Sequence, residues 1–163
     1  MPSARARKGS RERMLCQSEK SVYNNTMIPK ELVTAKSRVI SLYSTMSVEE
    51  AVKKMTKGHF QMVPVLEKDS GRYLYSLSAQ DLLNFIVSTG SYERALPLPL
   101  SNVPIDRLIL PCVLDTDIDS MVDLLANQNF VPLVDGSGIF QGIITRTKVI
   151  DMLVEQNQSN REE

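Results

Sequence analysis

The 163-residue sequence contains no tryptophan, one histidine and two cysteines. His59 has no nearby partners for a metal site, and a single histidine without a paired motif makes a Ser/His/Asp or Cys/His catalytic set hard to assemble. Cys16 and Cys112 follow neither ligand nor disulfide spacing, so both are expected to be reduced thiols, as is usual in a cytoplasm. We therefore expect a protein that needs no metal and is not an enzyme.

The sequence also lacks a charge imbalance and a long apolar run. Lys+Arg and Asp+Glu number 19 each, so the chain as a whole is not drawn to nucleic acid. No apolar stretch approaches the roughly 20 residues of a transmembrane helix, and none follows the basic N-terminus as in a secretory signal. Neither a Walker-type loop nor G-x-G-x-x-G occurs. We expect a cytoplasmic protein with no membrane or nucleic-acid polymer partner.

The two ends of the chain differ in composition from the rest. Residues 1–24 are basic and hold few large apolar side chains. They are expected to form a disordered tail, because they cannot bury enough surface to offset the entropy of ordering. The alternative for this segment is an arm that binds anions weakly. Residues 156–163 are expected to be a second, polar tail.

Between these ends, one pattern occurs twice. Apolar residues at i, i+3, i+4 and i+7 predict an amphipathic helix in each half, and the two sets are 70 positions apart. The sets are Val48, Ala51, Val52 and Met55, and Ile118, Met121, Val122 and Leu125. Downstream, each half has an apolar strand with a proline, a glycine turn, a second strand and a second helix. The proline strands contain Val63-Pro64-Val65 and Val131-Pro132-Leu133.

The predicted unit is strand, helix, strand, strand, helix. Its first strand is expected at residues 38–42 in one half and at residues 110–114 in the other. Ser78 and Thr145 are expected to cap the last helix of each unit. Residues 90–104 contain three prolines and are expected to form an extended connection.

The sequence thus predicts an α+β protein made of two β-α-β-β-α repeats. The first repeat, with a lead-in segment, covers residues 25–92, the connector covers 93–104, and the second repeat covers 105–155. Neither repeat alone, at about 50–60 residues, would bury much surface. We expect the two to pack sheet against sheet with pseudo-twofold symmetry. The exposed helices would permit a homodimer with a closed twofold interface.

This duplication resembles the CBS domain pair, or Bateman module, over roughly residues 38–154. The second repeat carries the most specific part of the resemblance. It contains Phe130-Val131-Pro132-Leu133-Val134-Asp135 and Gly138-Ile139-Phe140-Gln141-Gly142-Ile143-Ile144-Thr145-Arg146. Together with the lead-in Thr26-Met27-Ile28-Pro29, these segments are similar to the stand-alone CBS proteins of Gram-positive bacteria known as CbpB or DarB, which are cyclic di-AMP receptors. The resemblance implies a nucleotide bound in a cleft between the repeats, with its adenine against the short strands.

The resemblance also implies how the ribose would be held. In CBS pairs the ribose hydroxyls contact a Ser/Thr and an Asp spaced S/T-x-x-D at the start of the last helix, which Ser78 and Asp81 match. The second copy keeps the hydroxyl at Thr145 but has Lys148 in place of the aspartate. A carboxylate such as Asp81 is chemically suited to the role, because it can accept both hydrogen bonds of a ribose diol. One cleft would therefore keep the ribose acceptor, and the other would be altered or empty.

The phosphates of the implied ligand need cations. Arg146 follows the capping position of the last helix and would add a charge-assisted contact. Arg38, at the start of the first strand, would supply the second positive charge for a ligand with two phosphodiesters. The remaining residues of the predicted nucleotide site are Val39, Ile40, Phe60, Gln61, Met62, Val63, Pro64, Phe130, Val131, Pro132 and Thr147.

Several of these residues have an alternative role that needs no ligand. Ser78 and Asp81 would form a helix cap, and Arg146 would be a solvated surface charge. Strand aromatics and β-branched residues are expected in the core whatever else they contact. These are Phe60, Val63, Phe130 and Val131. The first repeat also has Tyr75 where the second has Gly142, and a tyrosine there would either narrow a cleft or stack on a base.

The predicted function is regulation by a nucleotide. A cyclic di-AMP receptor would present a different surface to a partner protein when its ligand is bound. The resemblance implies regulated partners among stringent-response or central-metabolism enzymes. Two alternatives stay open: a sensor of AMP, ADP or ATP, and an interaction scaffold that binds no nucleotide.

Overall fold

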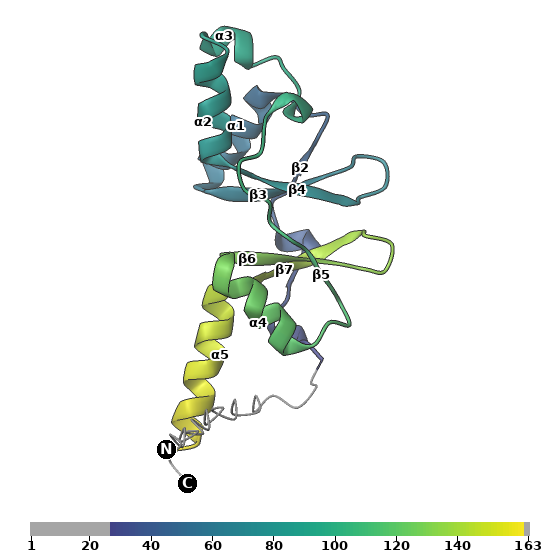
Figure 1. Cartoon of the computed structure of the whole chain (residues 1–163), viewed down its shortest axis with the longest axis vertical. Coiled ribbons are helices and arrows are strands. Elements are labelled where there is room, and N and C mark those ends of the chain that lie inside the picture. Colours follow the sequence, from purple (N-terminus) through teal and green to yellow (C-terminus); the bar gives the residue numbers. More distant parts are fainter. Residues whose placement is uncertain (1–26, 162–163) are drawn as a thin grey trace, which may run out of the picture.

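The computed structural model describes residues 27–161. The tail predicted over residues 1–24, Cys16, Thr26 of the lead-in and the last two residues of the polar tail lie outside the described residues. Figure 1 shows two sheets in the middle of an elongated molecule, with the helices of one repeat at one end and those of the other repeat at the opposite end. No helix in the described range is long and apolar enough to cross a membrane.

Each repeat has the predicted order of elements, which confirms the α+β fold class. The first contains β2 (Leu42–Tyr43), α1 (Val48–Gly58), β3 (Met62–Leu66), β4 (Tyr73–Ser78) and α2 (Ala79–Ser88). The second contains β5 (Cys112–Val113), α4 (Ile118–Asn127), β6 (Phe130–Val134), β7 (Phe140–Thr145) and α5 (Arg146–Ser159). Ser78 and Thr145 cap α2 and α5 as expected, because each hydroxyl accepts a hydrogen bond from a backbone N–H of the first turn.

The two sheets have the same internal register. In the first sheet, of order β2-β3-β4, Val63 lies opposite Leu77. In the second sheet, of order β1-β7-β6-β5 with β1 at Thr34–Ala35, Val131 lies opposite Ile144. Both hairpins shift register near the end of their first strand. The matching irregularity shows that the repeat extends to backbone detail.

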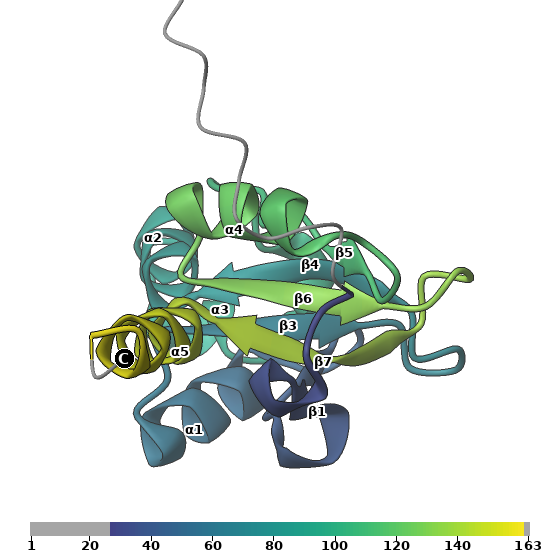
Figure 2. The ribbon, with the colours of Figure 1, turned by 90° about the horizontal axis from the view of Figure 1, so that it is seen from below.

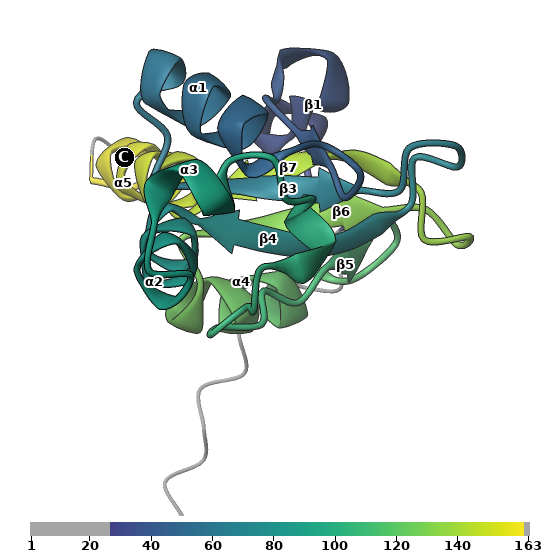
Figure 3. The same ribbon diagram turned by 90° about the horizontal axis from the view of Figure 1, so that it is seen from above.

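The repeats contact each other through related residues. Leu66 and Tyr73 of the first repeat pack with Val134 and Phe140 of the second in one buried cluster. The Tyr73 N–H donates to the Gly138 carbonyl, and the Phe140 N–H donates to the Gly71 carbonyl, each over 3.0 Å. Such reciprocal bonds are expected between two elements related by a twofold axis. Figures 2 and 3 view the molecule from its two ends and show β3 and β4 overlying β6 and β7.

The lead-in joins the second sheet. After η1 (Lys30–Leu32), β1 (Thr34–Ala35) pairs with the edge of β7, with Ala35 opposite Gly142. A Cβ on Gly142 would lie 2.3 Å from the Thr34 carbonyl oxygen. The glycine of the second repeat is therefore explained by close packing of β1. Tyr75, its counterpart in the first repeat, packs against that repeat's core and donates its hydroxyl to the Leu100 carbonyl over 3.3 Å.

The expected first strands are wrong at their N-terminal ends. Arg38 ends the 3-10 turn η2 (Lys36–Arg38), because the Val39 N–H donates to the Lys36 carbonyl over 3.2 Å. Only Leu42–Tyr43 pairs with β3. In the second repeat the strand is Cys112–Val113, because the side chain of Gln128 forms hydrogen bonds with the backbone N–H and carbonyl of Leu110.

The expected extended connection over residues 90–104 is also wrong. Ser91 caps the short helix α3 (Tyr92–Ala95), and the turn η3 (Leu100–Asn102) follows. The segment folds back on the start of α1, where the Val48 N–H donates to the Leu98 carbonyl over 2.8 Å. The connection thus satisfies orphan donors of α1, which the prolines do not reveal.

The buried hydroxyl of Tyr73 is expected to ionise only at high pH, with a loss of folding stability. Its buried hydroxyl donates to the Ile109 carbonyl over 2.8 Å, and burial raises the pKa of Tyr73 to about 12 from an ordinary value of 10.0. The neutral phenol is favoured in the folded state, so its contribution to stability is complete below pH 10 and disappears as the pH rises to about 12. Ultraviolet titration of tyrosinate should show this late ionisation, and Tyr73→Phe should remove it. Full ionisation of Tyr73 near pH 10 in the folded protein would contradict the packing between the repeats.

A candidate nucleotide cavity

The first repeat has an open cavity of about 660 Å³ between the segment that follows η2 and the C-terminal end of α1. We refer to it as the first-repeat cavity. Three residues of the predicted site line it, and five lining residues were not predicted. The predicted ones are Val39, Ile40 and Phe60, and the others are Ser41, Tyr43, Lys54, Lys57 and Gly58.

The end of α1 places Phe60 at this cavity. His59 follows the helix in the left-handed conformation, with φ 55°, and the Phe60 N–H donates to the Met55 carbonyl over 3.0 Å. The Phe60 ring packs over Gly58, where a Cβ would lie 2.0 Å from a ring carbon. The expectation that Phe60 is a core residue is wrong, because this turn leaves its side chain 39% exposed.

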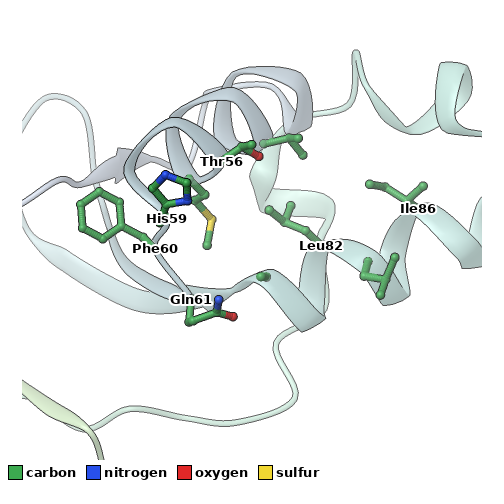
Figure 4. Close-up of a pocket in the computed structure, with 10 residues that line it drawn as sticks. Thr56, His59, Phe60, Gln61, Leu82 and Ile86 are labelled. Atoms are coloured by element: carbon green, nitrogen blue, oxygen red, sulfur yellow. The ribbon is translucent and has the colours of Figure 1, made fainter.

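Phe60 also borders a second hollow. A groove of about 360 Å³ runs between α1 and α2 and is lined mainly by apolar side chains of both helices. Figure 4 shows Phe60 and His59 at the end of this groove, with Gln61 below them and Leu82 and Ile86 on α2. His59 is exposed there. The Phe60 ring thus lies between the first-repeat cavity and this groove.

The first-repeat cavity is positively charged along one side. Lys54 and Lys57 line it from the last turns of α1, and both are exposed. Lys53, in contrast, pairs with Glu49 at 2.5 Å, which is the ion pair found within residues 27–161. An exposed aromatic ring beside two ammonium groups that form no ion pair within residues 27–161 is chemically suited to a planar, anionic ligand.

Ser78 and Asp81 form a buried capping box. The Asp81 carboxylate accepts from the Ser78 N–H at 2.9 Å and from the Ser78 hydroxyl at 2.6 Å. Its other oxygen accepts from the Asp106 N–H at 3.2 Å, and the residue is 5% exposed. The capping alternative is therefore confirmed. The ribose role remains a prediction, in which a diol would have to compete with these intrachain bonds.

The two predicted phosphate ligands do not lie together. Arg38 is exposed at the end of η2, next to the first-repeat cavity but not in its lining. The Arg146 guanidinium instead donates to two carbonyls at the end of α4, to Leu125 at 2.8 Å and Gln128 at 2.9 Å. Arg146 thus satisfies helix-end acceptors. Thr145 and Thr147 begin α5, with Thr145 as its cap.

The other predicted site residues belong to the strands. Val63, Pro64, Val131 and Pro132 are buried, and Val63, Phe130 and Val131 confirm the expected core positions. Met62 is half-buried in β3, and Gln61 lines the groove between α1 and α2. Val63 and Val131 thus belong to the separate cores of the first and the second repeat.

The comparisons with known proteins agree with this architecture. Residues 30–88 match the model of the CBS domain family. Among solved structures, CbpB in complex with c-di-AMP has a TM-score of 0.74 and 15% identity, over 84% of this chain and 90% of that chain. The Listeria monocytogenes CbpB protein in complex with c-di-AMP has a TM-score of 0.66 and 22% identity, over 78% of this chain and 96% of that chain.

A third structure carries a different nucleotide. CBSX2 in complex with AMP has a TM-score of 0.62 and 18% identity, over 78% of this chain and 96% of that chain. No curated protein sequence gives a significant match. At these identities the structural likeness establishes the fold. Residues 30–88 match the CBS domain family, and the chain has the fold of the CBS-domain proteins to which it is structurally similar.

Proposed function

We propose that this chain binds an adenine nucleotide, cyclic di-AMP in the first place, in the first-repeat cavity, and that occupancy controls a partner protein. The observation that carries the proposal is the pairing of exposed apolar residues, Ile40 and Phe60, with Lys54 and Lys57 around one cavity of about 660 Å³. The similar structures of CbpB with c-di-AMP and CBSX2 with AMP support an adenine ligand.

In this proposal, adenine stacks on the Phe60 ring and contacts Ile40, while phosphates approach Lys54 and Lys57. Stacking on an aromatic side chain stabilises a base by about 1–3 kcal/mol. The two negative charges of cyclic di-AMP would be offset by the two lysines, with Arg38 next to the cavity as a further cation. The smaller cavity of about 330 Å³ beside Asp81 is lined by Asp106 as well, and two carboxylates disfavour a phosphate there.

Regulation would act through the lead-in segment, which connects the second sheet to the first-repeat cavity. The chain passes from β1, on the second sheet, through η2 to Val39 and Ile40 in the first-repeat cavity. A ligand that binds one arrangement of this segment more tightly would shift the protein toward it, and a partner that recognises the same arrangement would be coupled to the ligand. A homodimer and a stringent-response or central-metabolism enzyme as partner remain predictions. A cytoplasmic location also remains a prediction, made from the cysteines and the lack of long apolar segments in the sequence.

A mononucleotide is the second candidate. The likeness to CBSX2 with AMP favours it, and the first-repeat cavity has space for one adenine and its phosphates. A sensor of AMP, ADP or ATP would use the same residues, since base stacking and phosphate contacts are common to all of these ligands. Regulation without catalysis is expected for either ligand.

A nucleotide panel tests the proposal. We expect cyclic di-AMP to raise the stability of the protein by about 2.7 kcal/mol at 100 times its Kd, measured by thermal shift, and AMP or ATP to act more weakly. Cyclic di-GMP is the control for base identity. Phe60→Ala should weaken binding about tenfold or more, whereas Tyr92→Ala, which removes an exposed aromatic outside the cavity, should not. A larger shift with AMP would favour the second candidate, and no shift with any nucleotide would refute the proposal.

A further inference from the structure

The repeat offset identifies the second-repeat counterparts of two cavity residues. Met62 and Phe130 begin equivalent strand pairings and are 68 positions apart, so the counterpart of Phe60 is Gln128. At the first strands, Leu42 corresponds to Cys112 with an offset of 70, so the counterpart of Ile40 is Leu110. The pair that faces the first-repeat cavity, Ile40 and Phe60, is thus replaced by Leu110 and Gln128. We call their location the second-repeat position.

Gln128 closes the second-repeat position with hydrogen bonds. Its Oε1 accepts from the Leu110 N–H at 2.8 Å, and its Nε2 donates to the Leu110 carbonyl at 3.1 Å and to the Phe130 carbonyl at 3.3 Å. The residue is 5% exposed, compared with 39% for Phe60. The buried primary amide thus pairs with both backbone groups of one residue, and both of its N–H groups are donated to the chain itself.

The shorter second repeat explains why Gln128 turns inward. The offset falls from 70 at the helix caps, Ser47 and Asp117, to 68 at the strands, because α4 is one residue shorter than α1 and the connection that follows it is also one residue shorter. α4 therefore ends without the left-handed residue of the first repeat, and Gln128 follows it in extended conformation, with φ −125°. Arg146 then holds the Gln128 carbonyl at 2.9 Å, which fixes the backbone of this residue.

The amide of Gln128 has the hydrogen-bonding pattern of an adenine edge. Adenine presents an acceptor, N1, beside a donor, the N6 amino group, and an amide presents its oxygen beside its nitrogen in the same way. Both patterns match the N–H and carbonyl of one residue in a strand, as the bonds of Gln128 to Leu110 show. Phe60 has neither donor nor acceptor, so it leaves the backbone of Ile40 without a side-chain partner in the described chain.

We infer that Gln128 takes the place of an adenine at the second-repeat position, so that each chain binds one nucleotide, in the first-repeat cavity. The inference rests on the proposed function, because it presumes that adenine is the ligand of these positions. Its consequence is specific: removing the amide should expose a second adenine-binding position without changing the first.

Calorimetric titration with AMP and with cyclic di-AMP tests this inference. The wild-type chain should bind one AMP, and Gln128→Ala should bind two, with the first affinity changed less than about twofold. Gln156→Ala, which removes an exposed glutamine from α5, is the matched control and should still bind one. Gln128→Asn, whose shorter side chain should not reach both groups of Leu110, serves as a second variant if Gln128→Ala does not fold.

The outcomes separate the two claims. Two AMP molecules per wild-type chain would overturn the role of Gln128, and so would a stoichiometry of one in a folded Gln128 variant. No binding by the wild-type chain would instead overturn the proposed function. In that case, binding of one AMP by Gln128→Ala alone would still support the closure of the second-repeat position.

Discussion

The Lys54→Glu/Lys57→Glu double variant is expected to bind cyclic di-AMP about 100-fold more weakly than the wild-type chain at low ionic strength. Both lysines line the first-repeat cavity, and neither is neutralised by an ion pair in the described chain. Replacing two attractions with two repulsions affects each phosphodiester of the ligand. The loss should shrink as salt is added, because exposed charges are screened over about 10 Å at 0.1 M. Calorimetry at two salt concentrations measures both effects.

A matched control separates local contacts from net charge. Lys30→Glu/Lys53→Glu makes the same change in net charge at residues that do not line the first-repeat cavity. We expect this variant to lose less than about fivefold in affinity, since more distant charges are largely screened. Equal losses in the two double variants would contradict a phosphate site at Lys54 and Lys57.

The largest effect on stability is expected for Gly142→Ala. The added Cβ would lie 2.3 Å from the Thr34 carbonyl oxygen and 3.2 Å from the Thr34 carbonyl carbon, so the backbone of β1 must move away from β7. Overpacking against a backbone costs about 1–3 kcal/mol. For a chain of this size the Tm should fall by about 2–12 °C. Thermal unfolding followed by circular dichroism measures the change.

Gly136→Ala is the control for this substitution. A Cβ at Gly136 meets no heavy atom within 4 Å, and its φ is not in the left-handed region. We expect its free energy of unfolding to stay within about 0.5 kcal/mol of wild type. The same decrease for both variants would show that β1 does not pack on Gly142.

The repeats could be predicted because their signals are local. Apolar periodicity placed α1 and α4, and the hydroxyls of Ser78 and Thr145 placed the starts of α2 and α5. These patterns depend on helix geometry and on orphan N–H groups, which are visible in a short window of sequence. The offset between the repeats then implied two similar packing units, and the reciprocal bonds of Tyr73 and Phe140 agree with that symmetry.

The first strands and the site could not be predicted from local signals. Leu110 has an apolar side chain that favours a strand, but the Gln128 side chain, 18 positions away, forms hydrogen bonds with its backbone N–H and carbonyl. Phe60 is exposed because His59 adopts a left-handed conformation, and the presence of a histidine in a sequence does not predict that conformation. Lys54 and Lys57 gave a weak signal, a basic pair at i and i+3 near the end of a helix, which usually indicates a solvated face.

The prediction for Arg146 shows the limit of reasoning from a family pattern. A cation after a helix cap is suited to a phosphate, but the same guanidinium is equally suited to the free carbonyls at the end of α4. The sequence does not reveal which acceptor is nearer. In the structure the Arg146 guanidinium donates to the carbonyls of Leu125 and Gln128. The second of these bonds also fixes the backbone of Gln128, the residue that we infer to close the second-repeat position.

A crystal structure of the chain with cyclic di-AMP tests the central claim most directly. The account predicts one ligand per chain, with an adenine stacked on Phe60 beside Ile40 and a phosphate within hydrogen-bonding distance of Lys54 or Lys57. A ligand bound beside Asp81 and Asp106, with the first-repeat cavity filled only by water, would contradict it.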